Sequence, residues 1–413
     1  MKRLTISIYL ILITLIVSGQ WECRSKLGAH LKPFYKDFPL MWALEFTGGH
    51  GYMNDRDITN VMFFLGLDYK HKNHEIYLEG GRKAWHNSLG APSNYNSTRV
   101  SDNYFQVKRF GIREGFYRYT KDNTSFTAGF FSMNFGDYFL VNERGLGLKY
   151  INTFGNFSLQ ATAASVLKQF SRFGTFCSVH YLYNIIPETN SAYLGESIGE
   201  TNFAGAILKW KPNNNNDNEF NEFGTSKESI FKEAGLLYYQ ELGSGVDELS
   251  IHYGFTAQWL FPLKINLESE LLHQYKNNNQ DIIYYLKAYK QFNYGKYGQT
   301  IIALGYFGDY KIDDNALPYT SFSNLFIGEV MRMDIMDMPL YQLSAKHRIP
   351  KWKTQFKIQA TKQFTNQHIS EYDLAIGKTF FNNAKFTIMA CRMDADILNE
   401  IYYMLRGELR ITL

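Results

Sequence analysis

The stretch that decides the fold is Ile401–Leu413, which reads IYYMLRGELRITL. Every second residue from Ile401 onward is apolar, aromatic or glycine, and the charges fall on the other face, at Arg406, Glu408 and Arg410. Because neighbours along a β-strand point to opposite sides, the pattern predicts a strand with one apolar and one polar face. The stretch has 13 residues. An ordinary strand has about 5–6 residues, and a strand that crosses a bilayer needs about 9–11.

The same alternation returns along the chain, most clearly in Leu263–Leu271, Tyr341–Ile349, Lys351–Thr361 and Lys385–Ala390. Looser strands are expected to begin near Leu40, Val61, Glu75, Tyr104, Thr124, Leu146, Phe157, Phe173, Phe203, Ile230, Glu248, Ile282, Thr300 and Tyr372. Single-chain bacterial barrels have an even number of strands. The sequence therefore predicts an all-β fold, a single transmembrane antiparallel up-and-down β-barrel of about 18 strands, with about 16 as the fallback.

Composition supports a membrane barrel. The chain has 30 Tyr and 33 Phe, and aromatic residues make up 17% of it, as expected if they form girdles at two membrane interfaces. A mean hydropathy of −0.30 and the lack of a long apolar run after residue 20 exclude a helical membrane protein. Strand length and an undivided chain favour the barrel. A soluble secreted β-rich protein would show the same alternation and stays an alternative.

The N-terminus predicts export. Lys2 and Arg3 precede the apolar stretch Thr5–Val17, which is followed by small residues up to Gly19. We therefore expect a signal peptide at 1–20, an N-terminal periplasmic or lumenal segment at 21–38 and the barrel at 39–413. The predicted location is the outer membrane of a Gram-negative bacterium. Closing the barrel requires its first and last strands to pair, so we expect Leu40–Thr47 to lie antiparallel to Ile401–Thr412.

One short stretch resembles a known family. Thr127–Tyr150 reads TAGFFSMNFGDYFLVNERGLGLKY and is similar to a segment of porin-like outer-membrane proteins of the alginate-export type. The matching residues are Gly129, Phe135, Gly136, Asp137, Glu143, Arg144, Gly145 and Gly147. The resemblance covers roughly 25 of 413 residues and implies a monomeric 18-stranded barrel whose lumen admits a polar or charged solute. The residues themselves predict a bend at Gly136–Asp137 and a loop that contains Glu143 and Arg144.

The polar faces of the C-terminal strands are rich in cations. If their apolar faces contact lipid, these cations line the lumen: Lys346, Arg348, Lys351, Lys353, Lys357, Arg406 and Arg410. Barrels of this size leave an aqueous channel, and charged side chains along it act as a filter. The predicted function is a pore for passive diffusion of small hydrophilic solutes, anions among them.

Other chemistry has little support. Cys23, Cys177 and Cys391 fit neither a disulfide framework nor a metal site, and no cofactor or catalytic residue is predicted. His86 and Ser88 are the one pair that suits an enzyme acting on lipids, but Gly90 and Pro92 follow at once and predict a loop. The irregular stretch 313–337 predicts a long loop, folded inward as a constriction or outward as a lid.

The expected partners are outer-membrane lipid and lipopolysaccharide, the barrel assembly machinery and small hydrophilic solutes. A formal net charge of +4 gives no support for nucleic-acid binding. The alternative function is a plugged, surface-exposed barrel for binding or assembly, for example one that grips glycans.

Overall fold

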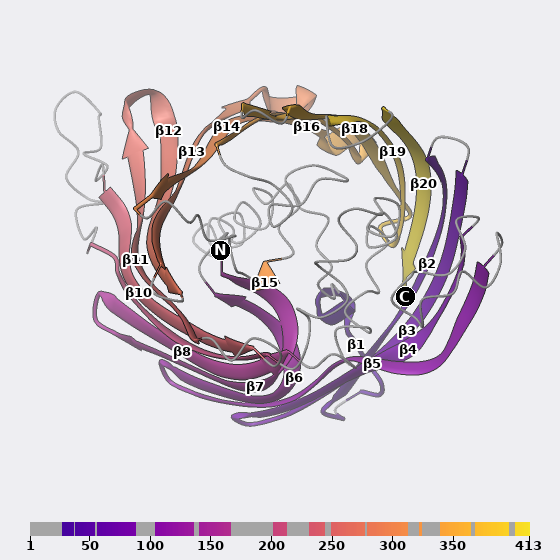
Figure 1. Ribbon diagram of the computed structural model, residues 1–413. Coiled ribbons are helices and arrows are strands. Elements are labelled where there is room, and N and C mark those ends of the chain that lie inside the picture. The colour runs from indigo at the N-terminus through magenta and orange to yellow at the C-terminus, as the bar shows by residue number, and fades with distance from the viewer. Residues whose placement is uncertain are drawn as a thin grey trace, which may run out of the picture.

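The strands close into a barrel. The computed structural model describes residues 27–36, 38–53, 56–87, 104–135, 140–166, 201–212, 231–243, 249–276, 279–312, 322–323, 339–364, 368–395 and 401–413. Over these residues the chain forms one 20-stranded sheet, in which β1 and β15 are short strands of two residues each. The other eighteen follow one another in sequence order and form a closed antiparallel ring (Figure 1). The predicted 18-stranded barrel is confirmed.

The ring strands have between 10 and 18 residues, long enough to span a bilayer when tilted. Their bounds are β2 Leu40–Met53, β3 Arg56–His71, β4 His74–Asn87, β5 Tyr104–Lys121, β6 Thr124–Phe135, β7 Val141–Phe154, β8 Phe157–Val166, β9 Thr201–Trp210, β10 Phe231–Gly243, β11 Leu249–Phe261, β12 Ile265–Lys276, β13 Asn279–Asn293, β14 Gln299–Lys311, β16 Leu340–Ile349, β17 Thr354–Phe364, β18 His368–Phe380, β19 Ala384–Ala395 and β20 Tyr402–Thr412. Short 3-10 turns are η1 Leu27–His30, η3 Pro262–Lys264, η4 Gly295–Tyr297 and η6 Pro350–Trp352.

The ring closes between the first and last long strands. β2 pairs antiparallel with β20, from Glu45 opposite Thr412 to Met53 opposite Met404. The predicted strand partners are confirmed, but the pairing uses Glu45–Met53 rather than Leu40–Thr47. The start of β2 extends past the end of β20, and β1 (Lys32–Pro33) pairs there with Trp42 and Met41 instead.

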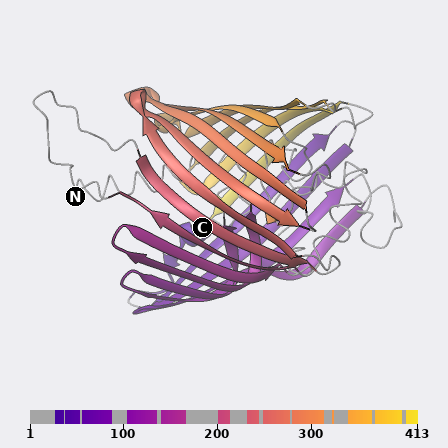
Figure 2. The ribbon, with the colours of Figure 1, turned by 60° about the vertical axis from the view of Figure 1, so that its left-hand side comes forward.

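The two ends of the barrel differ. At one end, turns as short as Lys72–Asn73 and Asp122–Asn123 join the strands, and the first residue of each has positive φ. Most of the longer connections lie at the other end, among them 88–103, 167–200 and 313–339, whereas 211–230 joins β9 to β10 at the first end. Figure 2 shows the inclined strands running between these ends. Outer-membrane barrels likewise have mostly short turns at one end, the periplasmic one, and long loops at the other.

The two faces of the ring differ in polarity. Exposed side chains on the outer face are mostly aliphatic or aromatic, among them Phe63, Leu65, Leu78, Leu148, Leu236, Leu271, Leu304, Leu343, Ile358, Leu374, Ile388 and Leu405. Buried polar residues alternate with them on the inner face, including Glu79, Glu270, Glu371 and Glu408. Apolar side chains turned outward and charges turned inward are the arrangement that a bilayer requires of a barrel.

No helix within the described residues is long and apolar enough to cross a membrane.

The N-terminal segment lies inside the ring. Leu27 of η1 is fully buried and packs against Ala43, Met62 and Phe64, which are on the inner faces of β2 and β3. Gly66 provides the space, because a Cβ there would lie 2.7 Å from Leu27 Cδ2. Figure 1 shows η1 and β1 within the barrel outline.

A second short segment also reaches the inside. β15 (Phe322–Ser323) comes between β14 and β16 in the sequence, yet it pairs in parallel with Val141 and Asn142 of β7. In Figure 1, β7 lies across the ring from β14 and β16, and β15 is drawn inside the outline. These two residues fit a loop folded inward. The remainder of 313–337 lies outside the described residues.

Candidate functional site

The inner face of β16–β20 carries most of the cations that the sequence singled out. Lys346 of β16 lies directly opposite Lys357 of β17, so two ammonium groups share one cross-strand position. Lys357 is only 8% exposed, and Lys346 is half-buried. Lys385 of β19 joins them on this face, since its Cε lies near the inner side of Gly377. Like charges placed directly opposite each other repel.

Two predicted arginines hold a carboxylate between them. Arg406 and Arg410 of β20 flank Glu408, whose carboxylate lies 2.8 Å from Arg406 Nη2 and 3.6 Å from Arg410 Nη2. Arg406 and Glu408 are nearly fully buried, whereas the Arg410 side chain is 28% exposed. Leu405, which precedes Arg406, and Leu409, which separates Glu408 from Arg410, are exposed on the outer face. The face assignment for this strand is therefore as predicted, and the group has a net charge of +1.

Three predicted lumen residues lie at the short-turn end of the barrel. The strand expected to start at Lys351 begins instead at Thr354, so Lys351 and Lys353 belong to the turn around η6. Pro350 has no N–H to donate to a ladder and Lys353 adopts positive φ, which together end the strand. Lys353 donates to Asn382 of the neighbouring turn. Arg348 is exposed at the end of β16.

The loop motif differs from its prediction. Gly136 and Asp137 lie outside the described residues. Glu143 and Arg144 were expected in a loop, but β7 begins at Val141 and both residues pair with β6. The β6–β7 ladder simply extends further toward the long-loop end than the sequence pattern indicated.

The opposite wall, β10–β13, is acidic. Its inner face carries five carboxylates, at Glu233, Glu241, Glu268, Glu270 and Asp281, against Lys287 on β13 and Lys209 on the adjoining β9, among the described residues. Glu233 accepts from both Lys209 and Lys211 at 2.9 Å, and Lys287 lies 3.6 Å from Glu268. In Figure 1 these strands lie on the left of the ring and β18–β20 on the right.

Sequence reasoning missed a third charged group, on β2–β5. The register of β4 and β5 shifts so that Ile112 faces Gly80 and Glu114 faces Glu79, which leaves Arg113 as an extra residue. A β-bulge of this kind re-aims a side chain. Arg113 is 5% exposed and donates to Glu79 and, over 2.9 Å, to Glu45.

This Arg113 group is closely packed. The guanidinium carbon lies 3.9 Å from the centre of the Phe64 ring, and Tyr77 donates to the Glu79 carboxylate over 2.5 Å. Phe64 also belongs to the buried cluster that contains Leu27, so Phe64 connects the Arg113 group to the N-terminal segment. The adjacent charges Arg113–Glu114 break the alternation of β5, and that break is the only sequence signal for the bulge.

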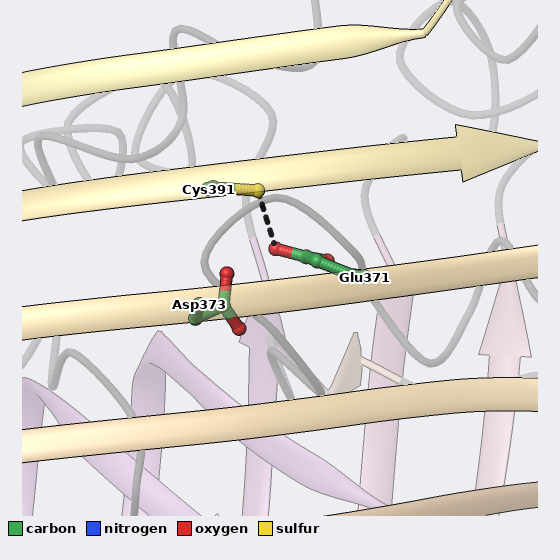
Figure 3. Close-up of side chains that lie close together, drawn as sticks. All are labelled: Glu371, Asp373 and Cys391. Carbon is green, nitrogen blue, oxygen red and sulfur yellow. Dashed lines mark hydrogen bonds between the residues drawn. The ribbon is translucent and has the colours of Figure 1, made fainter.

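A thiol meets two carboxylates on the basic wall. Cys391 of β19 donates to Glu371 of β18 over 3.2 Å and lies opposite Asp373 (Figure 3). All three are buried, and one ligand atom from each lies within 4.8 Å of the others. Sulfur and carboxylate ligands suit borderline divalent metals. Ordinary cross-strand pairing accounts for this grouping equally well, so it does not by itself define a metal centre.

The arrangement is therefore a ring whose described inner face is divided by charge. On β16–β20 the lysines and arginines outnumber the buried carboxylates Glu371, Asp373 and Glu408, whereas on β10–β13 the carboxylates outnumber the lysines. Such walls attract anions to the basic side and cations to the acidic side. They also orient the dipole of a solute that lies between them.

Comparison with known proteins bears on the fold. No protein-family profile and no curated protein sequence matches the chain. Among solved structures it is similar to Pseudomonas aeruginosa OccK5 (OpdH), with a TM-score of 0.54 and 11% identity over 91% of this chain and 98% of that one. The outer membrane protein opdK of the same organism has a TM-score of 0.52 and 12% identity, with 90% and 98% covered.

Acinetobacter baumannii OccAB2 matches with a TM-score of 0.52 and 12% identity, again over 90% of this chain and 98% of that one. The likeness extends along nearly the whole length of each structure, although few residues are shared. At this level of identity it establishes a common fold, a closed antiparallel β-barrel.

Proposed function

We propose that the chain is an outer-membrane pore for passive diffusion of small hydrophilic solutes, anions among them. The observation that carries the proposal is the closed ring itself, apolar outside and charged inside. Barrels of 16–18 strands are wide enough to hold water. The fold shared with opdK, which is named an outer membrane protein, supports the same location in a Gram-negative bacterium.

The proposed solute path follows the basic wall. Lys346, Lys357, Arg406 and Arg410 line it along the strands, and the exposed Arg348 extends it toward the short-turn end. Lys351 and Lys353 lie in the turn at that mouth, where they attract anions without lining the wall. Anions are expected to pass along this side, while the acidic wall opposite repels them.

The environment that we propose follows from the location. Residues 1–20 act as the export signal and 21–38 as a lumenal segment. The barrel assembly machinery inserts the barrel, 39–413, into the outer membrane. Lipopolysaccharide and outer-membrane lipid surround the barrel. The finer resemblance to the alginate-export type rests on Gly129–Gly147 alone, whereas the solved structures that match belong to the Occ proteins. No catalytic step is part of the proposal.

A second function has an observation in its favour. η1 packs inside the ring near the short-turn end, and β15 lies against β7 near the long-loop end. Segments inside the ring near both of its ends suit a plugged barrel that binds a surface ligand, such as a glycan, rather than an open pore.

Solute uptake into vesicles separates the two functions. Purified barrel in liposomes should admit a small carboxylate faster than a neutral sugar of equal size, and both faster than protein-free liposomes. Swelling at the rate of empty liposomes, from protein shown to be folded, would support the plugged barrel instead. Equal rates for the two solutes would remove the anion preference but keep the pore.

A further inference from the structure

An arginine lies among tyrosines on the outer face of the barrel, where β18, β19, β20 and β2 adjoin. Tyr372, Arg392 and Tyr403 are direct cross-strand partners and form one row across three strands. The Arg392 guanidinium carbon lies 6.0 Å from the centre of the Tyr403 ring, and its side chain is 50% exposed. All three residues lie near the long-loop ends of their strands.

A hollow lies directly beside this row. The next row of outward-facing residues along these strands is Leu374, Ala390 and Leu405. The short alanine side chain leaves a gap between the two leucines. The result is a groove of about 520 Å³. Its walls are Tyr52, Tyr372, Leu374, Arg392, Tyr403 and Leu405, and its floor contains Ala390 together with Asp373, Cys391 and Met404.

A cation on this face needs a physical reason. An outward arginine is strongly destabilising near the midplane of a bilayer, whereas near the interface it costs little. The surrounding tyrosines place Arg392 at interface depth, because their rings are apolar and their hydroxyls seek water. At that depth the anionic groups are lipid phosphates, which the planar guanidinium binds through two parallel hydrogen bonds.

We propose that this groove binds one phosphorylated lipid of the leaflet at the long-loop end. Its phosphate sits at Arg392, and one acyl chain lies over Ala390 between Leu374 and Leu405. Asp394, with a carboxylate oxygen 3.9 Å from Arg392 Nη2, competes for the same guanidinium. The inference rests on the proposed membrane location but not on conduction, because the groove is outside the ring.

The test uses the full-length barrel in detergent micelles and two probes, a bisphosphorylated lipid A and the same lipid with its phosphates removed. Bound lipid per barrel is counted by native mass spectrometry. The wild-type protein should prefer the phosphorylated probe about tenfold, the gain expected from one charge-assisted contact. Arg392→Gln should abolish that preference. Lys378→Gln is the matched control, since Lys378 lies over Phe380 at 5.4 Å near the short-turn end, and it should keep the preference.

Two more variants separate charge from shape. Ala390→Leu fills the hollow and should weaken binding of both probes, while Asp394→Asn should strengthen binding of the phosphorylated one. Equal binding of the two probes to wild-type protein, or an unchanged preference in folded Arg392→Gln, overturns the proposal. Channel conductance in Arg392→Gln should match wild type, so a failure of this inference and a failure of the pore are distinguishable.

Discussion

Removing the Glu408 carboxylate tests the packing of the inner wall. In Glu408→Gln, the nearly buried Arg406 loses an ion pair of 2.8 Å and Arg410 loses one of 3.6 Å. Breaking a buried pair by removing one partner costs about 3–5 kcal/mol. We expect the lower end, about 3 kcal/mol, because Arg410 is 28% exposed and water can solvate its charge.

Asp394→Asn is the matched control for this substitution. Arg392 and Asp394 have the same spacing on the neighbouring strand, but both are about half exposed on the outer face and lie 3.9 Å apart. An exposed pair of this kind contributes about 0–1 kcal/mol. Urea unfolding in lipid vesicles, followed by tryptophan fluorescence, measures both losses of free energy.

The double variant Arg406→Gln with Glu408→Gln completes the test. It should be more stable than the sum of the two single losses predicts, by at least about 1 kcal/mol, since the buried charges of Arg406 and Glu408 are then both absent and only the partly exposed Arg410 loses a partner. Equal losses in Glu408→Gln and Asp394→Asn would refute the reasoning, because Glu408 would then be as solvated as an exterior carboxylate.

Other predictions follow from the inner wall, the barrel seam and the N-terminal segment. Lys346→Glu with Lys357→Glu should shift reversal potentials in a KCl gradient toward cations, most strongly at about 0.01 M salt where the Debye length is about 30 Å; unchanged potentials in folded protein would place these residues off the path. Deleting residues 404–413 removes the partner of both β2 and β19, so no heat-modifiable band should appear in membranes, and such a band would mean that the ring closes without β20. Gly66→Leu should displace Leu27 and expose the N-terminal segment to protease while the barrel stays intact; continued protection would show that Leu27 does not hold the segment.

Strands with continuous alternation were predictable from the sequence. In Ile401–Leu413 the alternation of apolar and charged residues already indicates which side chains face outward. The structure places Leu405 and Leu409 outside and Arg406 inside. The strand number followed because each long strand carries its own pattern. Phe173, where another strand was expected to start, lies outside the described residues.

The candidate site was predictable only in part. The cations of β16–β20 could be assigned to one face from alternation, but their ion pairs depend on a register between strands that no local pattern contains. The Arg113 group required a bulge, because one extra residue in β5 changes which side chains face inward. Pro350 marked a break in the pattern, and sequence reasoning started the next strand three residues too early.

The meeting of Cys391 with Glu371 and Asp373 was not predictable either. These residues are about twenty positions apart and become neighbours only through the β18–β19 hairpin. Likewise, nothing local to Phe322–Ser323 indicates that β15 pairs with β7 across the ring.

The most direct test of the account is conductance through single barrels in a planar bilayer. An open ring with charged walls predicts steady, ohmic current steps whose size rises with salt concentration and which are absent without protein. Protein that is folded and inserted, as shown by heat-modifiable migration, yet gives no current over the accessible voltage range would contradict the pore and leave a plugged barrel.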